Sequence, residues 1–160
     1  MAMESFVNLL SFSNPVFSSF AFWGSILVIK CLFMSTFTGL YRWKNGVTSN
    51  PEDVRMAERI GIRGETKETD PDVDRARRAH LNDLENILPY LIVGSFYVLT
   101  NPSLGTAKLL FQVATIARII HTFVYAIFVI PQPSRLLSWL VHYLITLYMA
   151  VMVVIYSYNK

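Results

Sequence analysis

The chain has 160 residues, of which 53% are hydrophobic and 16% charged, and its formal net charge is +3. Soluble globular domains carry about 25% charged residues, so this composition indicates one membrane-embedded domain over 1–160. A small charge of mixed sign argues against a nucleic-acid partner. With a single cysteine, Cys31, and three widely separated histidines, we expect neither an intramolecular disulfide nor a metal site.

The charged residues are concentrated in one segment of the chain. Between Arg42 and Arg78 lie 17 of them, nine basic and eight acidic, while the other eight are scattered over more than 120 residues. Polytopic membrane proteins keep most of their charge in loops. The distribution therefore predicts a polar loop over about 42–75.

Four apolar stretches flank this loop, over about 16–41, 76–100, 107–129 and 136–156. Each approaches or exceeds the roughly 20 residues that a helix needs to cross a bilayer. The sequence therefore predicts an all-α integral membrane protein. The N-terminus has neither a basic region nor a small-residue cleavage site, so we expect the first span to be retained. The positive-inside rule places the 42–75 loop and Arg135 on the cytosolic side.

Within the loop, the sequence NPED at 50–53 is typical of a helix start, because Asn50 can cap the helix and the acidic residues favour its N-terminal end. We predict a short amphipathic helix over 51–60. The mostly charged segment 65–72 is expected to be mobile. Asp70 or Asp72 then begins the second spanning helix.

Polar side chains interrupt the second and third spans. In the stretch RRAHLNDLENILP, helical spacing places Arg78, Asn82 and Glu85 on one face. In the third span the polar residues at spacings i, i+3, i+4 and i+7 are Arg118, His121, Thr122 and Tyr125. Ionisable groups at membrane depth are costly and mark a functional site by default.

Two cations lie within the apolar spans. For Lys30 the first interpretation is that it snorkels or pairs inside the bundle, and the alternative is that it faces a polar cavity shared with Glu85. Arg118 lies about halfway along its span and needs an anionic partner, for which Glu85 and Asp83 are the candidates.

The chain contains no motif of a soluble enzyme class, such as a P-loop or GxSxG. The chemistry therefore depends on a polar cluster near the cytosolic boundary, made of Arg77, Arg78, His80, Asn82, Glu85, Arg118, His121, Tyr125 and Arg135. Several arginines suit the carboxylates of a small zwitterion, and a carboxylate suits its ammonium. A cationic pocket also activates a bound thiol. The residues alone indicate a membrane enzyme or a binder of a small anion, with an interhelical packing role as the alternative for half of them.

Three motifs carry a resemblance to a known family. RRAHLNDLENI (77–87), ARIIHTFVY (117–125) and PQPSR (131–135) closely resemble the MAPEG family of membrane-associated eicosanoid and glutathione enzymes, and the resemblance runs from about residue 27 to about 150. It implies a left-handed four-helix bundle that assembles as a homotrimer, with glutathione as co-substrate between neighbouring subunits. It also implies the endoplasmic reticulum membrane, with the mitochondrial outer membrane as an alternative, and an active site that faces the cytosol.

The resemblance further implies roles for individual residues. The positions that resemble glutathione contacts are Arg42, Arg77, Arg78, His80, Asn82, Glu85, His121 and Tyr125, and Arg118 joins them from the polar stripe. Arg135 matches the arginine that stabilises the glutathione thiolate, and Asp53 matches a loop acid near it, so these two are the expected catalytic residues.

Within the family, the prostaglandin E synthase pattern differs from this chain at three positions. A serine, a tyrosine and an arginine of that pattern are replaced here by Leu136, Trp139 and Leu81. We therefore expect the transferase activity, in which glutathione attacks a hydrophobic electrophile from the bilayer, with peroxidase activity toward lipid hydroperoxides. The alternatives are a prostaglandin E synthase and a non-catalytic membrane scaffold or regulator.

Overall fold

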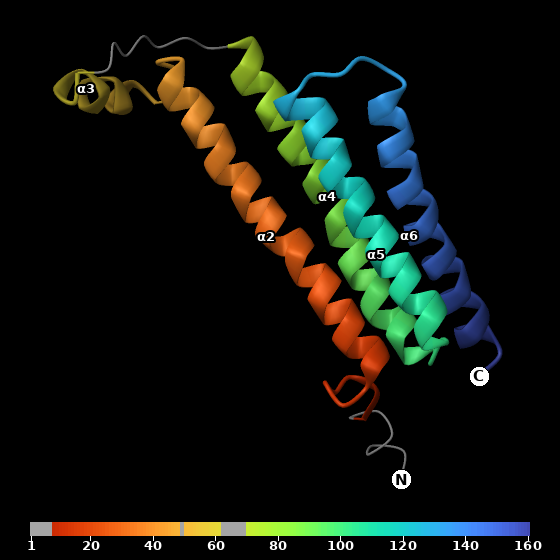
Figure 1. Cartoon of the computed structure of the whole chain (residues 1–160). Coiled ribbons are helices and arrows are strands. Elements are labelled where there is room, and N and C mark those ends of the chain that lie inside the picture. Colours follow the sequence, from red (N-terminus) through yellow and green to blue (C-terminus); the bar gives the residue numbers. More distant parts are fainter. Residues whose placement is uncertain (1–7, 49, 62–69) are drawn as a thin grey trace.

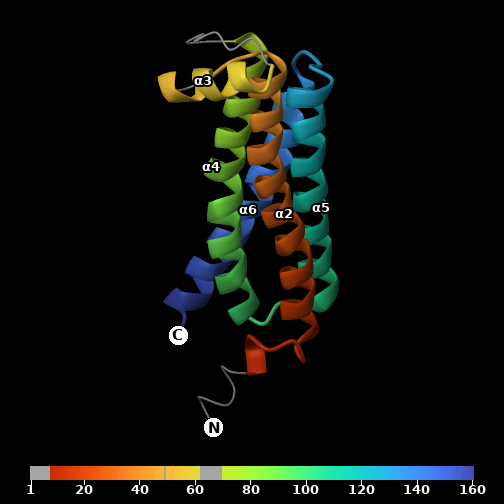
Figure 2. The same ribbon diagram turned by 90° about the vertical axis from the view of Figure 1, so that its left-hand side faces the viewer.

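A computed structural model describes residues 8–48, 50–61 and 70–160 of the chain. Its helices, in chain order, are α2 (Pro15–Lys44), α3 (Pro51–Arg59), α4 (Pro71–Leu99), α5 (Leu104–Thr122), the π-helix η1 (Phe123–Ile127) and α6 (Ser134–Tyr158). The four long helices run side by side, and α3 lies across their loop end (Figures 1 and 2). Both α2 and α6 pack against α4 and α5. The prediction of an all-α protein is confirmed.

Three of the long helices are long and apolar enough to cross a membrane: α2, α5 continued by η1, and α6. The second predicted span, α4, is not among them, because its apolar run begins only at Ile87, after Asn82, Asp83 and Glu85. Membrane insertion of α4 therefore stays a prediction, as do the left-handed packing and the homotrimer.

The predicted starts of two helices are confirmed, although one cap differs. The Oδ1 atom of Asp70 accepts hydrogen bonds from the backbone N–H groups of Asp72 and Val73, so Asp70 caps α4. The backbone of Asn50 precedes α3, but its side chain makes no capping bond and instead donates to Asp53 at 2.9 Å. The predicted Asn50 side-chain cap is therefore wrong. Of the segment expected to be mobile, 65–69 lies outside the described residues.

The apolar core joins the four long helices. It includes Phe20 and Leu27 of α2, Tyr90 of α4, Phe111 of α5 and Met149 of α6. Many large apolar side chains stay exposed on the outer faces of these helices. Such a surface suits a lipid environment, in which apolar side chains need no cover from the rest of the protein.

The segment after α5 departs from the predicted geometry. The third span was expected to continue as one regular helix to about residue 129, but η1 replaces its last turn. The connection between the third and fourth predicted spans, 130–135, is also shorter, since α6 already begins at Ser134. Arg135 consequently lies in the first turn of a helix. The backbone N–H of Leu136 donates to Gln132 Oε1 at 3.0 Å, which ties this turn to the connecting segment.

Candidate functional site

A buried network of charged side chains connects three helices. Asp83 of α4 accepts from Lys30 Nζ of α2 at 2.5 Å and from Arg118 Nη2 of α5. All three residues are buried, Asp83 and Arg118 completely. Asp83 is therefore the partner that Arg118 was predicted to need, and the pairing of Lys30 inside the bundle is confirmed. Glu85, which in the alternative interpretation shares a cavity with Lys30, is exposed.

The same network reaches the edge of a polar pocket. Arg118 Nη1 donates to Asn82 Oδ1 at 3.0 Å. Asn82 in turn lines a pocket of about 220 Å³ at the loop end of the bundle, together with His121, Tyr125, Gln132, Arg135, Leu136 and Trp139. Side chains from α4, α5, η1 and α6 thus converge on one small volume that lies next to the buried charges.

Aromatic contacts position the basic groups of this pocket. The Cζ atom of Arg135 lies 5.0 Å from the centroid of the Tyr125 ring, a cation–π distance. The ring of His121 meets the same tyrosine edge to face, with 5.4 Å between centroids. Tyr125 belongs to η1, and π-helical turns inside α-helices occur frequently at functional sites.

Several polar nitrogens of the predicted site have no partner. Arg42 Nε, Arg118 Nε, His121 Nδ1 and Arg135 Nε are buried and find no hydrogen-bond partner among the described residues. Buried polar atoms are nearly always paired, so each exception needs an explanation. Of the three arginines, Arg135 is the one that lines the polar pocket, so a polar ligand bound there would supply the missing acceptor for its Nε.

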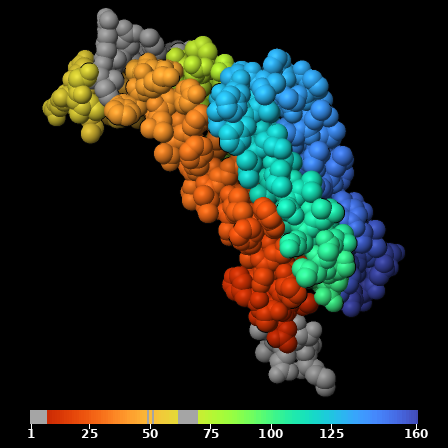
Figure 3. All heavy atoms as spheres, in the orientation of Figure 1, coloured from red at the N-terminus to blue at the C-terminus, as the bar shows by residue number. Residues whose placement is uncertain are grey.

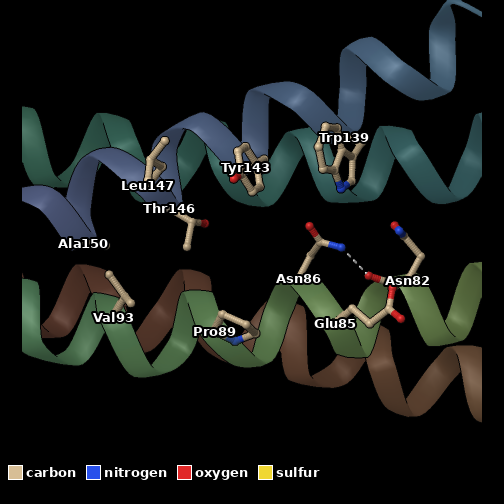
Figure 4. A pocket seen from close by; sticks show the side chains of 10 residues that line it. All are labelled: Asn82, Glu85, Asn86, Pro89, Val93, Trp139, Tyr143, Thr146, Leu147 and Ala150. Carbon is tan, nitrogen blue, oxygen red and sulfur yellow. Dashed lines mark hydrogen bonds between the residues drawn. The ribbon is translucent and has the colours of Figure 1, made fainter.

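An apolar groove of about 570 Å³ adjoins the polar pocket (Figure 4). It lies between α4 and α6 and is lined by Asn82, Glu85, Asn86, Pro89, Val93, Trp139, Tyr143, Thr146, Leu147 and Ala150. Asn82 and Trp139 line both spaces, so the groove and the polar pocket share a wall. The stacked rings of Trp139 and Tyr143, with centroids 4.9 Å apart, form part of the α6 side of the groove.

The structure brings together only part of the predicted site. Asn82, His121, Tyr125 and Arg135 line the polar pocket, Glu85 lines the adjoining groove, and Arg118 lies behind Asn82. The other predicted residues, which line neither space in the described part of the chain, are Arg42, Asp53, Arg77, Arg78 and His80. Asp53 is exposed on α3, which extends beyond the side of the bundle (Figure 3).

Other lining residues were not predicted from the sequence. On α4, Asn86 follows Asn82 by one turn, and its Nδ2 atom donates to the Asn82 carbonyl at 2.7 Å. On α6, the lining residues fall at 139, 143, 146, 147 and 150, which is one helical face. This spacing was present in the sequence, but nothing distinguished it from an ordinary packing face.

Known proteins share this chain's motifs and length. The model of the MAPEG family matches residues 20–155. The chain belongs to the MAPEG family. It is 44% identical to microsomal glutathione S-transferase 1 of Sus scrofa and to that of Homo sapiens. Each alignment spans 137 residues, which is 86% of this chain and 88% of the relative. Prostaglandin E synthase of Macaca fascicularis is 36% identical over 116 residues, 72% of this chain and 74% of the relative.

The MAPEG match includes the whole candidate site. The range 20–155 contains the buried network and every residue that lines the polar pocket and the groove. The resemblance predicted from the three motifs is therefore confirmed, with prostaglandin E synthase as a more distant relative.

Proposed function

We propose that this MAPEG protein is a membrane-bound glutathione S-transferase that joins the glutathione thiolate to hydrophobic electrophiles. The proposal is supported by the 44% identity to microsomal glutathione S-transferase 1 over most of both chains. The observation that carries it is the shared wall between a small polar pocket with a cation and a larger apolar groove. A reaction between a polar thiol and an apolar electrophile requires two such adjoining spaces.

Glutathione is a substrate with two carboxylates, one ammonium and a thiol, and the polar pocket offers matching groups. Arg135 is the catalytic residue in this proposal, because its half-buried guanidinium has an unpartnered Nε and would stabilise the thiolate. Asn82, His121 and Tyr125 would contact the tripeptide. Glu85, exposed at the start of the groove, would hold the ammonium.

The remaining predicted contacts are assigned to a site completed by a neighbouring subunit of the homotrimer. These are Arg42, Arg77, Arg78, His80 and the second proposed catalytic residue, Asp53. They lie toward the loop end of the bundle, but they do not line the polar pocket of a single subunit. Arg118 has a different role in this account, because its guanidinium is completely buried and binds Asp83 and Asn82.

The apolar groove is the proposed binding site for the second substrate. It lies between α4 and α6, and in this proposal a hydrophobic electrophile or a lipid hydroperoxide would enter it from the bilayer. Lipid hydroperoxides would be reduced by the same thiolate. In this arrangement α4 also spans the membrane, as the second of four spans, with its polar first half shielded in a left-handed bundle. The loop end faces the cytosol, in the endoplasmic reticulum membrane or the mitochondrial outer membrane.

Leu136 favours conjugation over prostaglandin isomerisation. It lines the polar pocket at the position where the synthase pattern has a serine, so the hydroxyl of that pattern is missing here. An apolar side chain cannot donate a hydrogen bond to an endoperoxide oxygen. The synthase activity is therefore the second candidate, supported only by the more distant relative.

The test is a paired activity assay on the detergent-purified protein with glutathione. One reaction contains a chlorinated aromatic electrophile and the other a prostaglandin endoperoxide. We expect conjugation in the first and no isomerisation above the uncatalysed rate in the second. Isomerisation without conjugation would favour the synthase, and the absence of both activities and of glutathione binding would favour the scaffold.

A further inference from the structure

The buried network contains more positive than negative charge. Lys30 and Arg118 each contribute one cation, and Asp83 is the carboxylate that both of them bind. The side chains are 8%, 0% and 0% exposed, respectively, so water screens them little. Arg118 with Asp83 alone would be a neutral pair. Lys30 therefore supplies the excess charge of the cluster.

Arg118 connects this cluster to the polar pocket through Asn82. Its Nη1 atom donates to Asn82 Oδ1 at 3.0 Å, so the oxygen of the Asn82 amide is directed toward Arg118. A side-chain amide has one oxygen and one NH₂ group, so the NH₂ group of Asn82 is left to donate elsewhere. Asn82 lines both the pocket and the groove, and Figure 4 shows its side chain directed from α4 toward the space below α6.

We propose that the Lys30–Asp83–Arg118 cluster is a positioning element of the thiol site. In this proposal, which rests on the proposed function, Arg118 presents the Asn82 NH₂ group to the ligand, and the excess charge from Lys30 favours the ionised form of the bound thiol. Lys30 does not touch the ligand and acts only through its charge. The proton of the thiol leaves to solvent, and no other bond changes in this step.

Other charged or titratable groups also face the site and are kept constant in the test. They are His121 of α5, Tyr125 of η1, Arg135 of α6 and Glu85 of α4. A unit charge at about 10 Å, with an effective dielectric constant of about 20, changes a pKa by about one pH unit. Removal of the Lys30 charge alone should therefore change the pKa of the bound thiol by a measurable amount.

The experiment is a pH titration of the ultraviolet thiolate absorbance of glutathione on the full-length protein in detergent. Lys30→Gln removes the charge but keeps a group that can donate to Asp83, and Lys30→Arg keeps the charge. Lys108→Gln is the matched control, because it removes a lysine near the opposite end of the α5 span, where Lys108 is exposed. If Lys30→Gln does not fold, Lys30→Met provides a neutral side chain of similar length.

We expect Lys30→Gln to raise the apparent pKa of the bound thiol by about one pH unit, while Lys30→Arg and Lys108→Gln titrate like the wild type. A wild-type titration curve in Lys30→Gln or Lys30→Met would overturn the inference and leave the proposed function intact. An equal change in Lys108→Gln would also overturn it, because the effect would then not depend on the cluster. The absence of a thiolate signal in the wild type itself would overturn the proposed function and this inference together.

Discussion

The guanidinium of Arg135 lies over the ring of Tyr125, with Cζ 5.0 Å from the ring centroid. This contact connects the first turn of α6 to η1. The sequence pattern predicted neither the start of α6 at Ser134 nor the change from α-helix to π-helix at Phe123. The same ring is met edge to face by His121. Tyr125 therefore contacts both basic groups of the polar pocket.

Loss of this ring should misplace Arg135. We expect Tyr125→Leu to lower kcat/KM for conjugation about fivefold, which corresponds to a cation–π contribution of about 1 kcal/mol. Tyr125→Phe keeps the aromatic face, so its loss should be smaller. The comparison is made by steady-state kinetics at saturating glutathione. Equal losses in the two variants would assign the effect to the hydroxyl group and contradict the positioning role of the ring.

Removal of the buried carboxylate should destabilise the protein strongly. Asp83→Asn leaves Lys30 and Arg118 as two buried cations without a counter-charge, and breaking such a buried network costs about 3–5 kcal/mol. The matched control is Asp72→Asn, which breaks the exposed pair with Arg75 and should cost less than about 1 kcal/mol.

Both variants are compared with the wild type by thermal denaturation in one detergent. A similar melting temperature for Asp83→Asn and Asp72→Asn would show that the buried network contributes no more to stability than a surface pair.

A tight contact between Gly94 of α4 and Phe20 of α2 gives a second stability test. A Cβ atom at Gly94 would lie 2.5 Å from Phe20 Cε2, so Gly94→Ala should destabilise the bundle by about 1–3 kcal/mol. At Gly39, also inside a helix, an added Cβ meets no described atom within 4 Å. Gly39→Ala should therefore be neutral or stabilise α2 by up to about 1 kcal/mol. In thermal denaturation we expect Gly94→Ala to lower the melting temperature and Gly39→Ala to leave it unchanged or raise it. An equal decrease in both variants would contradict the packing described here.

The buried face of α4 shows how much the sequence predicts. Asp83, Ile87, Tyr90 and Gly94 recur at spacings of four, three and four, so helical periodicity alone places Asp83 among apolar core residues. Glu85 lies about 200° away around the helix and therefore faces a different neighbour. Capping chemistry likewise predicted the start of α4 at Asp70, because that signal is local.

The features that could not be predicted depend on contacts between distant segments. The sequence offers no local signal for η1, since no proline or glycine interrupts 123–127. Lys30 and Asp83 are 53 positions apart in the sequence. Their pairing could be predicted only from the way in which α2 packs on α4. In the proposed homotrimer, Asp53 would reach the site of a neighbouring subunit, and the pattern of one chain gives no signal for such a contact.

The part of the groove around Tyr143, beyond Glu85, should bind the electrophile and not glutathione. Tyr143 lines the groove but not the polar pocket. We expect Tyr143→Ala to raise KM for an apolar electrophile about fivefold, corresponding to about 1 kcal/mol of lost aromatic contact. The dissociation constant of glutathione, measured by isothermal titration in detergent, should stay unchanged. Weaker glutathione binding with an unchanged KM for the electrophile would reverse this assignment of the two spaces.

The central claim, activation of a glutathione thiol by Arg135, is tested most directly by stopped-flow thiolate absorbance. Glutathione is mixed at neutral pH with the wild type, with Arg135→Ala, and with Arg75→Ala as a control at an arginine that forms an exposed pair with Asp72. We predict a glutathione-dependent thiolate signal in the wild type and in Arg75→Ala, and its loss in Arg135→Ala. A thiolate signal of wild-type amplitude in Arg135→Ala would contradict the account.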